Sequence, residues 1–213
     1  MEINDSFLKT VGDSGANDIL AEMGEITIDS IVGNDAISQI PIIGTLRSLY
    51  KINNSVSDYL FIQKLLKFFN ELGQISDSKK EKMILRIGKD EKYRDRVGDD
   101  LLEIINKIDN SDKPRLIAKL FIAYIEEIIS LEKFFKYSQI INHSFLPDLM
   151  KISDYDLGQV LSIEDSSSLL SLGLIEVKTI QRTGSVSMMS QAQNNQIEFV
   201  LNPNGRELYD LIN

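Results

Sequence analysis

Carboxylates in two clusters are the side chains of this chain best suited to chemistry. Asp99, Asp100 and Glu103 form one cluster, and Glu126 and Glu127 form the other. Paired carboxylates can perform acid–base catalysis or hold a divalent cation. Adjacent residues point to different sides of a helix, however, and both clusters lie opposite apolar stripes. We therefore expect solvated helix faces, because Asp and Glu are mostly exposed in folded proteins.

His143 is the single histidine, and the chain has no cysteine. A metal site built on imidazole usually needs two or three histidines, and a Ser–His–Asp relay needs further partners. At its position before Phe145-Leu146-Pro147, His143 is expected to be half-buried or to cap a helix. Nucleophile-elbow, phosphate-loop, dinucleotide-binding and EF-hand motifs do not occur in the sequence. We therefore predict no catalytic residue, no metal site and no cofactor, and favour a protein that is not an enzyme.

Apolar residues at helical spacing predict a mainly α protein with two parts. Residues 16–150 are expected to form a bundle of about six to seven helices. A polar, glycine-containing stretch at residues 1–15 is expected to be a flexible arm in front of it. Pro147 marks the boundary to a small α+β module at residues 151–213.

The clearest of the expected helices follows Asp112, a suitable N-cap, and has Pro114 in its first turn. Pairs of apolar residues recur every four positions from there to Ile128 and Ile129. Such a wide apolar stripe is typical of a helix packed in the centre of a bundle.

The order of elements in residues 151–213 carries the most structural information. A helix that ends at Gly173 is followed by two strands separated by a polar stretch, and then by a closing helix that starts after Asn202. This part resembles the winged-helix superfamily through two stretches, Leu172-Gly173-Leu174-Ile175 and Leu201 to Gly205-Arg206-Glu207-Leu208. The resemblance implies a winged-helix-like module, which binds DNA in many members of the superfamily and binds proteins in others.

The charges of this module favour a protein ligand over DNA. The expected reading helix, Ile163 to Leu172, has two acidic residues, four serines and no basic residue, and Thr183 to Gln196 carries no charge. Affinity for DNA depends on clustered Lys and Arg at the phosphates. Lys178 and Arg182 are the candidate phosphate contacts if the module binds DNA. If it binds a protein, the candidate contacts are Met188 and Met189, because methionine adapts to irregular apolar surfaces.

The helical part has a resemblance of its own. Residues 35–150 resemble an uncharacterised family of bacterial all-helical proteins, through Ile40-Pro41-Ile42-Ile43-Gly44 and through Asp90 to Gly98. Members of that family are loosely associated with mobile elements and phage defence. The resemblance implies such a context and no mechanism.

The apolar segment at residues 36–52 is the candidate for membrane contact. It carries only Arg47 and Lys51 as basic residues, whereas amphipathic membrane-binding helices are usually rich in Lys and Arg. The net charge of −9 also disfavours anionic membranes and nucleic acid. The absence of cysteine, of a signal peptide and of an 18-residue apolar run leads us to expect a cytoplasmic protein.

Three functions remain open at this point. The leading hypothesis is a non-enzymatic regulator, adaptor or accessory protein that acts through contact with a protein partner or through self-association, in bacterial anti-phage defence. The second is a DNA-binding transcriptional regulator. The third is a membrane-active effector that uses residues 36–52.

Overall fold

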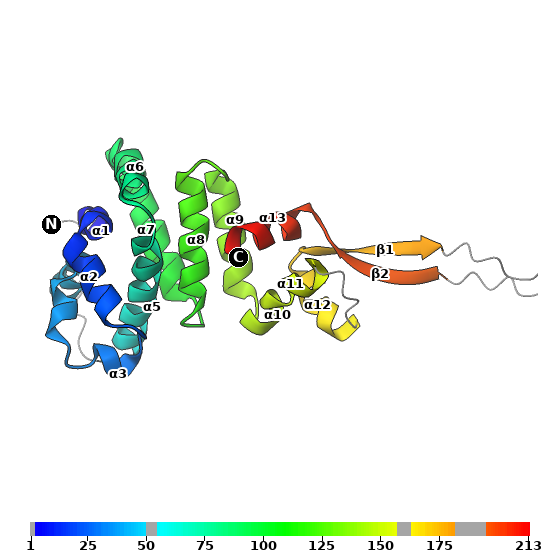
Figure 1. Cartoon of the computed structure of the whole chain (residues 1–213), viewed down its shortest axis with the longest axis horizontal. Helices are drawn as coiled ribbons and strands as arrows, with labels where there is room; N and C mark the ends of the chain where they lie inside the picture. The colour runs from blue at the N-terminus through cyan, green and yellow to red at the C-terminus, as the bar shows by residue number, and fades with distance from the viewer. Residues whose placement is uncertain (1–2, 50–54, 157–162, 182–194) are drawn as a thin grey trace, which may run out of the picture. The chain divides into compact units, whose positions relative to one another are not determined.

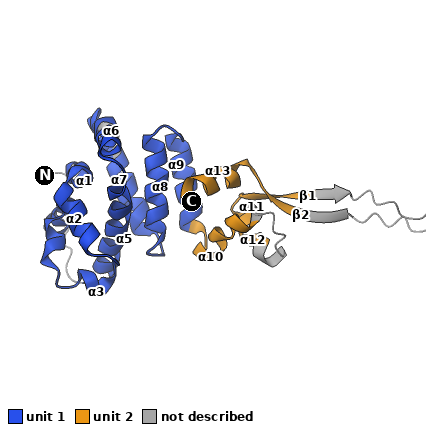
Figure 2. Ribbon diagram, in the orientation of Figure 1, with its two compact units in different colours: residues 1–142 blue, residues 143–213 orange. Residues whose placement is uncertain are grey.

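The computed structural model of the chain is mainly helical, with one small antiparallel sheet (Figure 1). It describes residues 3–49, 55–156, 163–181 and 195–213. The chain divides into two compact units, residues 1–142 and residues 143–213 (Figure 2). The boundary between the units falls after Asn142, earlier in the sequence than the boundary predicted between residues 150 and 151.

The first unit is all-helical within its described residues. Its elements are α1 (Ile3–Gly12), α2 (Ser14–Glu22), α3 (Ile28–Ile31), the 3₁₀-helix η1 (Asp35–Gln39), α4 (Pro41–Leu49), α5 (Val56–Gly73), α6 (Asp77–Gly88), α7 (Glu91–Lys107), α8 (Lys113–Ile125) and α9 (Leu131–His143). These helices are more numerous than the six to seven predicted. One reason is that the apolar stretch after Asn17 is divided: Gly24, at φ 59°, lies between α2 and α3.

The prediction of a flexible arm at residues 1–15 is wrong, because most of this stretch forms α1 and contributes to the core. Phe7 is 2% exposed, and its ring centroid lies 5.2 Å from that of Phe69. The buried face of α1 also carries Thr10, whose hydroxyl donates to the Ser6 carbonyl at 2.8 Å and accepts the Ile42 N–H at 3.0 Å. A buried face with so few large apolar residues does not show as a stripe in the sequence.

The centre of the first unit is the packing of α5 along α8 (Figure 1). Phe121 of α8 is fully buried, with ring centroids 6.1 Å from Phe7, 6.1 Å from Phe68 and 5.8 Å from Phe134. The prediction that the helix after Asp112 is central is therefore confirmed. Its predicted last apolar pair does not belong to it, since α8 ends at Ile125.

The second unit contains short helices, a two-stranded sheet and a closing helix. Its elements are α10 (Leu146–Met150), α11 (Ile152–Asp156), α12 (Ile163–Ser171), β1 (Ile175–Gln181), β2 (Asn195–Leu201) and α13 (Pro203–Ile212). Gly173 lies between α12 and β1 with φ 68°, a left-handed conformation that favours glycine. Asn202 caps α13, since its side-chain oxygen accepts the Gly205 N–H at 2.9 Å. The predicted order of helix, two strands and closing helix is confirmed.

Candidate functional site

The carboxylates of Glu126 and Glu127 are ion-paired with α6. The Glu126 Oε1 lies 2.6 Å from Lys79 Nζ, and the Glu127 Oε1 lies 3.3 Å from Arg86 Nη1. Arg86 also donates to the Ile125 carbonyl at 2.9 Å and lies over the Tyr124 ring, 4.7 Å from its centroid. These contacts tie α6 to the end of α8. Both carboxylates are therefore engaged in ion pairs with α6.

The second carboxylate cluster lies on α7 beside a cavity of about 510 Å³ bounded by α1, α4, α5 and α7. Its walls combine acidic and apolar side chains, including Asp58, Asp99, Glu103, Leu46, Phe61 and Leu102. Asp58 accepts the Ser55 N–H at 3.2 Å, and Glu103 is paired with Lys107. The described residues contain no group of three or more potential ligands that could hold a metal ion.

His143 is the last residue of α9 and is exposed, in contrast to the half-buried position expected for it. Its exposed position does not test the other prediction, that His143 caps a helix.

The described part of residues 36–52 forms η1 and α4, and its apolar side chains belong to the core. Ile37, Ile42 and Ile43 are each 0% exposed. Gly44 lets η1 approach α4, since a Cβ at this position would lie 2.9 Å from the Ser38 carbonyl oxygen. No helix in the described residues is both long enough and apolar enough to cross a membrane.

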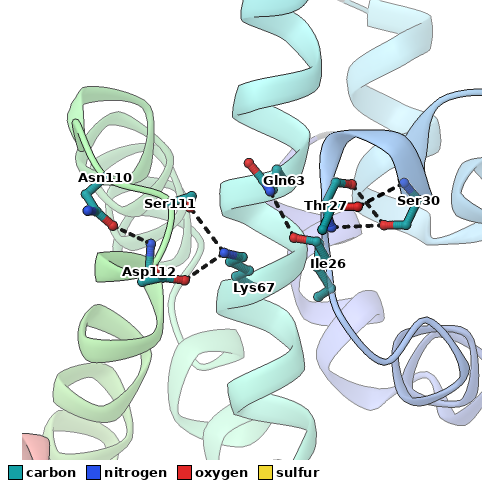
Figure 3. Close-up of polar contacts among 8 residues, drawn as sticks. All are labelled: Ile26, Thr27, Ser30, Gln63, Lys67, Asn110, Ser111 and Asp112. Carbon is teal, nitrogen blue, oxygen red and sulfur yellow. Dashed lines mark hydrogen bonds and ion pairs between the residues drawn. The ribbon is translucent and has the colours of Figure 1, made fainter.

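Two buried polar side chains of α5 make contacts that sequence reasoning missed (Figure 3). Gln63 donates to the Ile26 carbonyl at 2.9 Å, and Lys67 contacts the Asp112 carboxylate at 2.7 Å. Asp112 begins α8 without a side-chain cap bond, so the predicted N-cap interaction is replaced by this ion pair. The only signal in the sequence is that Gln63 and Lys67, four residues apart, interrupt the apolar face of α5.

Lys113 is a second buried lysine at the same connection. Its side chain is 1% exposed, and Nζ lies 2.6 Å from the Asp109 carboxylate and 3.0 Å from the Asn142 carbonyl oxygen. The hydrogen bond from Lys113 lowers the pKa of Asp109, an effect that the desolvation of the carboxylate partly opposes. Desolvation lowers the pKa of Lys64, which donates to the Asn106 carbonyl at 3.2 Å, while the charge of Asp109 raises it.

The depressed pKa of Asp109 predicts a pH-dependent contribution to stability. The folded-state pKa lies below the unfolded one, so the contribution is fully present above about pH 4 and is lost as the pH falls through the folded-state pKa. Asp109→Asn should lower the free energy of unfolding at neutral pH by about 1–3 kcal/mol, because the Asp109 carboxylate is largely exposed but the Lys113 ammonium that loses its charged partner is buried. Denaturant titrations of both proteins at several pH values measure this difference. If the difference in the free energy of unfolding between the two proteins stays constant down to the acid range, the lowered pKa of Asp109 is contradicted.

In the second unit, α12 corresponds to the predicted reading helix. Its exposed side chains include Ser167, Leu170 and Ser171, which share one face because they are three and four residues apart. Leu170 is 41% exposed. The described exposed side chains of α12 are therefore neutral, and one of them is a large apolar group.

The two faces of the β1–β2 hairpin differ in the middle of the strands, where one is apolar and the other is charged. Val177 lies opposite Phe199, and Val177 is 48% exposed. On the other face, Lys178 lies opposite Glu198 and its Nζ is 3.5 Å from the Glu176 carboxylate. The candidate phosphate contact Lys178 is thus surrounded by acidic residues. Three further candidates lie outside the described residues: Arg182, Met188 and Met189.

Comparison of the chain with protein-family models, with curated proteins and with solved structures found no match.

Proposed function

We propose that the chain is a non-enzymatic regulator, adaptor or accessory protein, and that its second unit is a winged-helix-like module that contacts another protein. The exposed face of α12 is the observation that carries the proposal. A reading helix presents Arg and Lys to DNA, whereas this face presents Leu170 between two serines. A partly exposed leucine gains free energy when a partner protein covers it.

The hairpin supports the same proposal. Lys178 is flanked by Glu176 on its own strand and by Glu198 on the neighbouring strand. These carboxylates offset the positive charge that a phosphate would need. Half-exposed Val177 adds apolar surface beside it. An anti-phage setting is what the resemblance of the helical part implies for this protein.

The two alternatives have weaker support. DNA binding would depend on Lys178 and Arg182 in a strongly acidic chain. Membrane activity through residues 36–52 would require Ile37, Ile42 and Ile43 to leave the core, at a free-energy cost of about 1.5–3 kcal/mol for each side chain.

Leu170→Asp tests the proposed contact. We expect the variant to lose at least about tenfold in partner binding, because truncating a central apolar contact commonly weakens binding by more than 1 kcal/mol. Cross-linking in the native cells followed by affinity purification compares the variant with wild type. Leu85→Asp is the matched control, since Leu85 is an exposed leucine (68%) on α6 of the first unit. Equal partner yield from wild type and Leu170→Asp would refute the α12 contact.

DNA binding is tested separately in a gel-shift assay at low salt, where non-specific binding is strongest. We expect no retardation of duplex DNA. Retardation that is lost in the double variant Lys178→Ala/Arg182→Ala would support the DNA-binding alternative instead.

A further inference from the structure

The outer edge of β1 offers an open and self-complementary surface. We infer that β1 pairs antiparallel with β1 of a second copy of this chain, about a two-fold axis at Val177. This inference rests on the proposed role of the second unit in protein contacts, and it names a second copy as one of its partners.

The backbone pattern of the hairpin leaves Val177 ready for pairing. The Asn202 N–H donates to the Leu174 carbonyl at 3.1 Å, in line with the register that pairs Ile175 with Leu201. Hydrogen-bonded and non-hydrogen-bonded pairs alternate along an antiparallel ladder. The N–H and C=O groups of Val177 therefore point away from β2. In the described part of the sheet β1 pairs with β2 alone, so these groups face an open edge.

The charges along β1 match those of an antiparallel copy. With the two-fold axis at Val177, Glu176 of each copy lies directly opposite Lys178 of the other copy. Symmetry makes two such pairs, and opposite charges at directly facing positions stabilise a sheet. The edge of β2 has no equivalent arrangement. With a two-fold axis at residue 198, Glu198 would face Glu198 of the other copy. With the axis at residue 199 it would face Val200, and with the axis at residue 197 it would face Gln196.

The apolar face would also become continuous. Val177 and Phe199 are opposite each other within one hairpin, and pairing at Val177 places two such pairs in one row across four strands. The row would cover Val177, which is 48% exposed in the single chain. Apolar side chains that face each other across neighbouring strands stabilise a sheet, so this row would add to the stability of the pairing.

Two charge variants test the pairing. Glu176→Lys alone would place lysine opposite lysine, and Lys178→Glu alone would place glutamate opposite glutamate. We expect each variant to self-associate at least about tenfold more weakly than wild type, because two attractive pairs become repulsive. In an equimolar mixture, each lysine of the first variant faces a glutamate of the second. We therefore expect the mixture to form a heterodimer, seen by native mass spectrometry and sedimentation velocity.

Val177→Pro tests the backbone pairing independently of charge. Proline removes an N–H that β2 does not use, so the hairpin should persist while self-association is lost. Val177→Thr keeps the N–H and a β-branched side chain, and it should retain the dimer. Circular dichroism and the thermal midpoint of each variant show whether the second unit remains folded, including Lys178→Glu, which also faces Glu198.

The outcomes separate this inference from the proposed function. A wild-type chain that stays monomeric over the whole concentration range would overturn the inference, and so would a dimer that the charge variants and Val177→Pro leave unchanged. If a monomeric chain still captures a different partner through Leu170, the inference fails and the proposed function stands. If the chain forms the β1 dimer but captures no other partner, the inference stands and the proposed contact through Leu170 fails.

Discussion

Replacing Gly205 with alanine is expected to destabilise the second unit by about 2–4 kcal/mol. A Cβ at this position would lie 2.0 Å from the Leu174 carbonyl oxygen and 2.9 Å from its carbonyl carbon. These are backbone atoms, so no side-chain rotation can relieve the overlap. The clash would separate the start of α13 from the start of β1.

Two hydrogen bonds at the same place explain the size of the effect. The Leu174 carbonyl accepts the Asn202 N–H at 3.1 Å, and Asn202 in turn caps α13 by accepting the Gly205 N–H at 2.9 Å. Displacement of α13 would break at least one of these bonds and expose the buried side chains of Leu208 and Ile212. Loss of a helix cap alone costs about 1 kcal/mol.

Hydrogen exchange of the amides in the second unit, together with denaturant unfolding, measures this effect. Gly88→Ala is the matched control, because Gly88 ends α6 and a Cβ there would meet nothing within 4 Å. The control should leave stability unchanged or raise it by up to about 1 kcal/mol, through the smaller entropy of the unfolded chain. If the amides of Gly205→Ala exchange at the same rates as those of wild type, α13 does not approach β1 this closely.

Replacing Phe121 with alanine is expected to lower the free energy of unfolding of the first unit by about 3–5 kcal/mol. The ring is fully buried and packs against aromatic residues from three other helices, Phe7, Phe68 and Phe134. Their backbones are held in α1, α5 and α9, so the surroundings can fill only part of the space that the ring leaves. The transfer free energy and the cavity therefore add.

Urea unfolding followed by the helical circular dichroism signal measures the loss. Phe145→Ala is the control, since the Phe145 side chain is 65% exposed and should contribute less than about 0.5 kcal/mol. A loss in Phe121→Ala no larger than in the control would mean that the aromatic cluster does not form as described.

Long helices with regular apolar stripes can be predicted from the sequence, because 3.6-residue periodicity reports burial directly. The helix after Asp112 is such a case. The start of the chain is not, because Ser6 and Thr10 share the buried face of α1 with Phe7, and small polar residues do not register as a stripe. Their burial becomes favourable only when their hydroxyls find acceptors, as Thr10 does.

Some features of the candidate sites could likewise be predicted from the sequence, and others could not. The lack of basic residues on α12 is a property of composition, so the amino-acid sequence is enough to establish it. The ion pairs that the Asp109–Asp112 connection makes with Lys67 and Lys113 could not be predicted. A lysine such as Lys67 or Lys113 is buried only if carboxylate and carbonyl oxygens lie around it, and several of those oxygens come from residues distant in sequence.

The sequence alone determined the mainly helical class, the order of elements after residue 151 and the acidic net charge, because these depend on local periodicity, turn residues and composition. Tertiary structure alone decided that α1 belongs to the core, that the side chains of Lys67 and Lys113 are buried, and that Val177 lies on an edge of the described sheet. The physical reason is that the burial of polar side chains, ion pairing and strand pairing are relations between distant residues, and no local pattern encodes them.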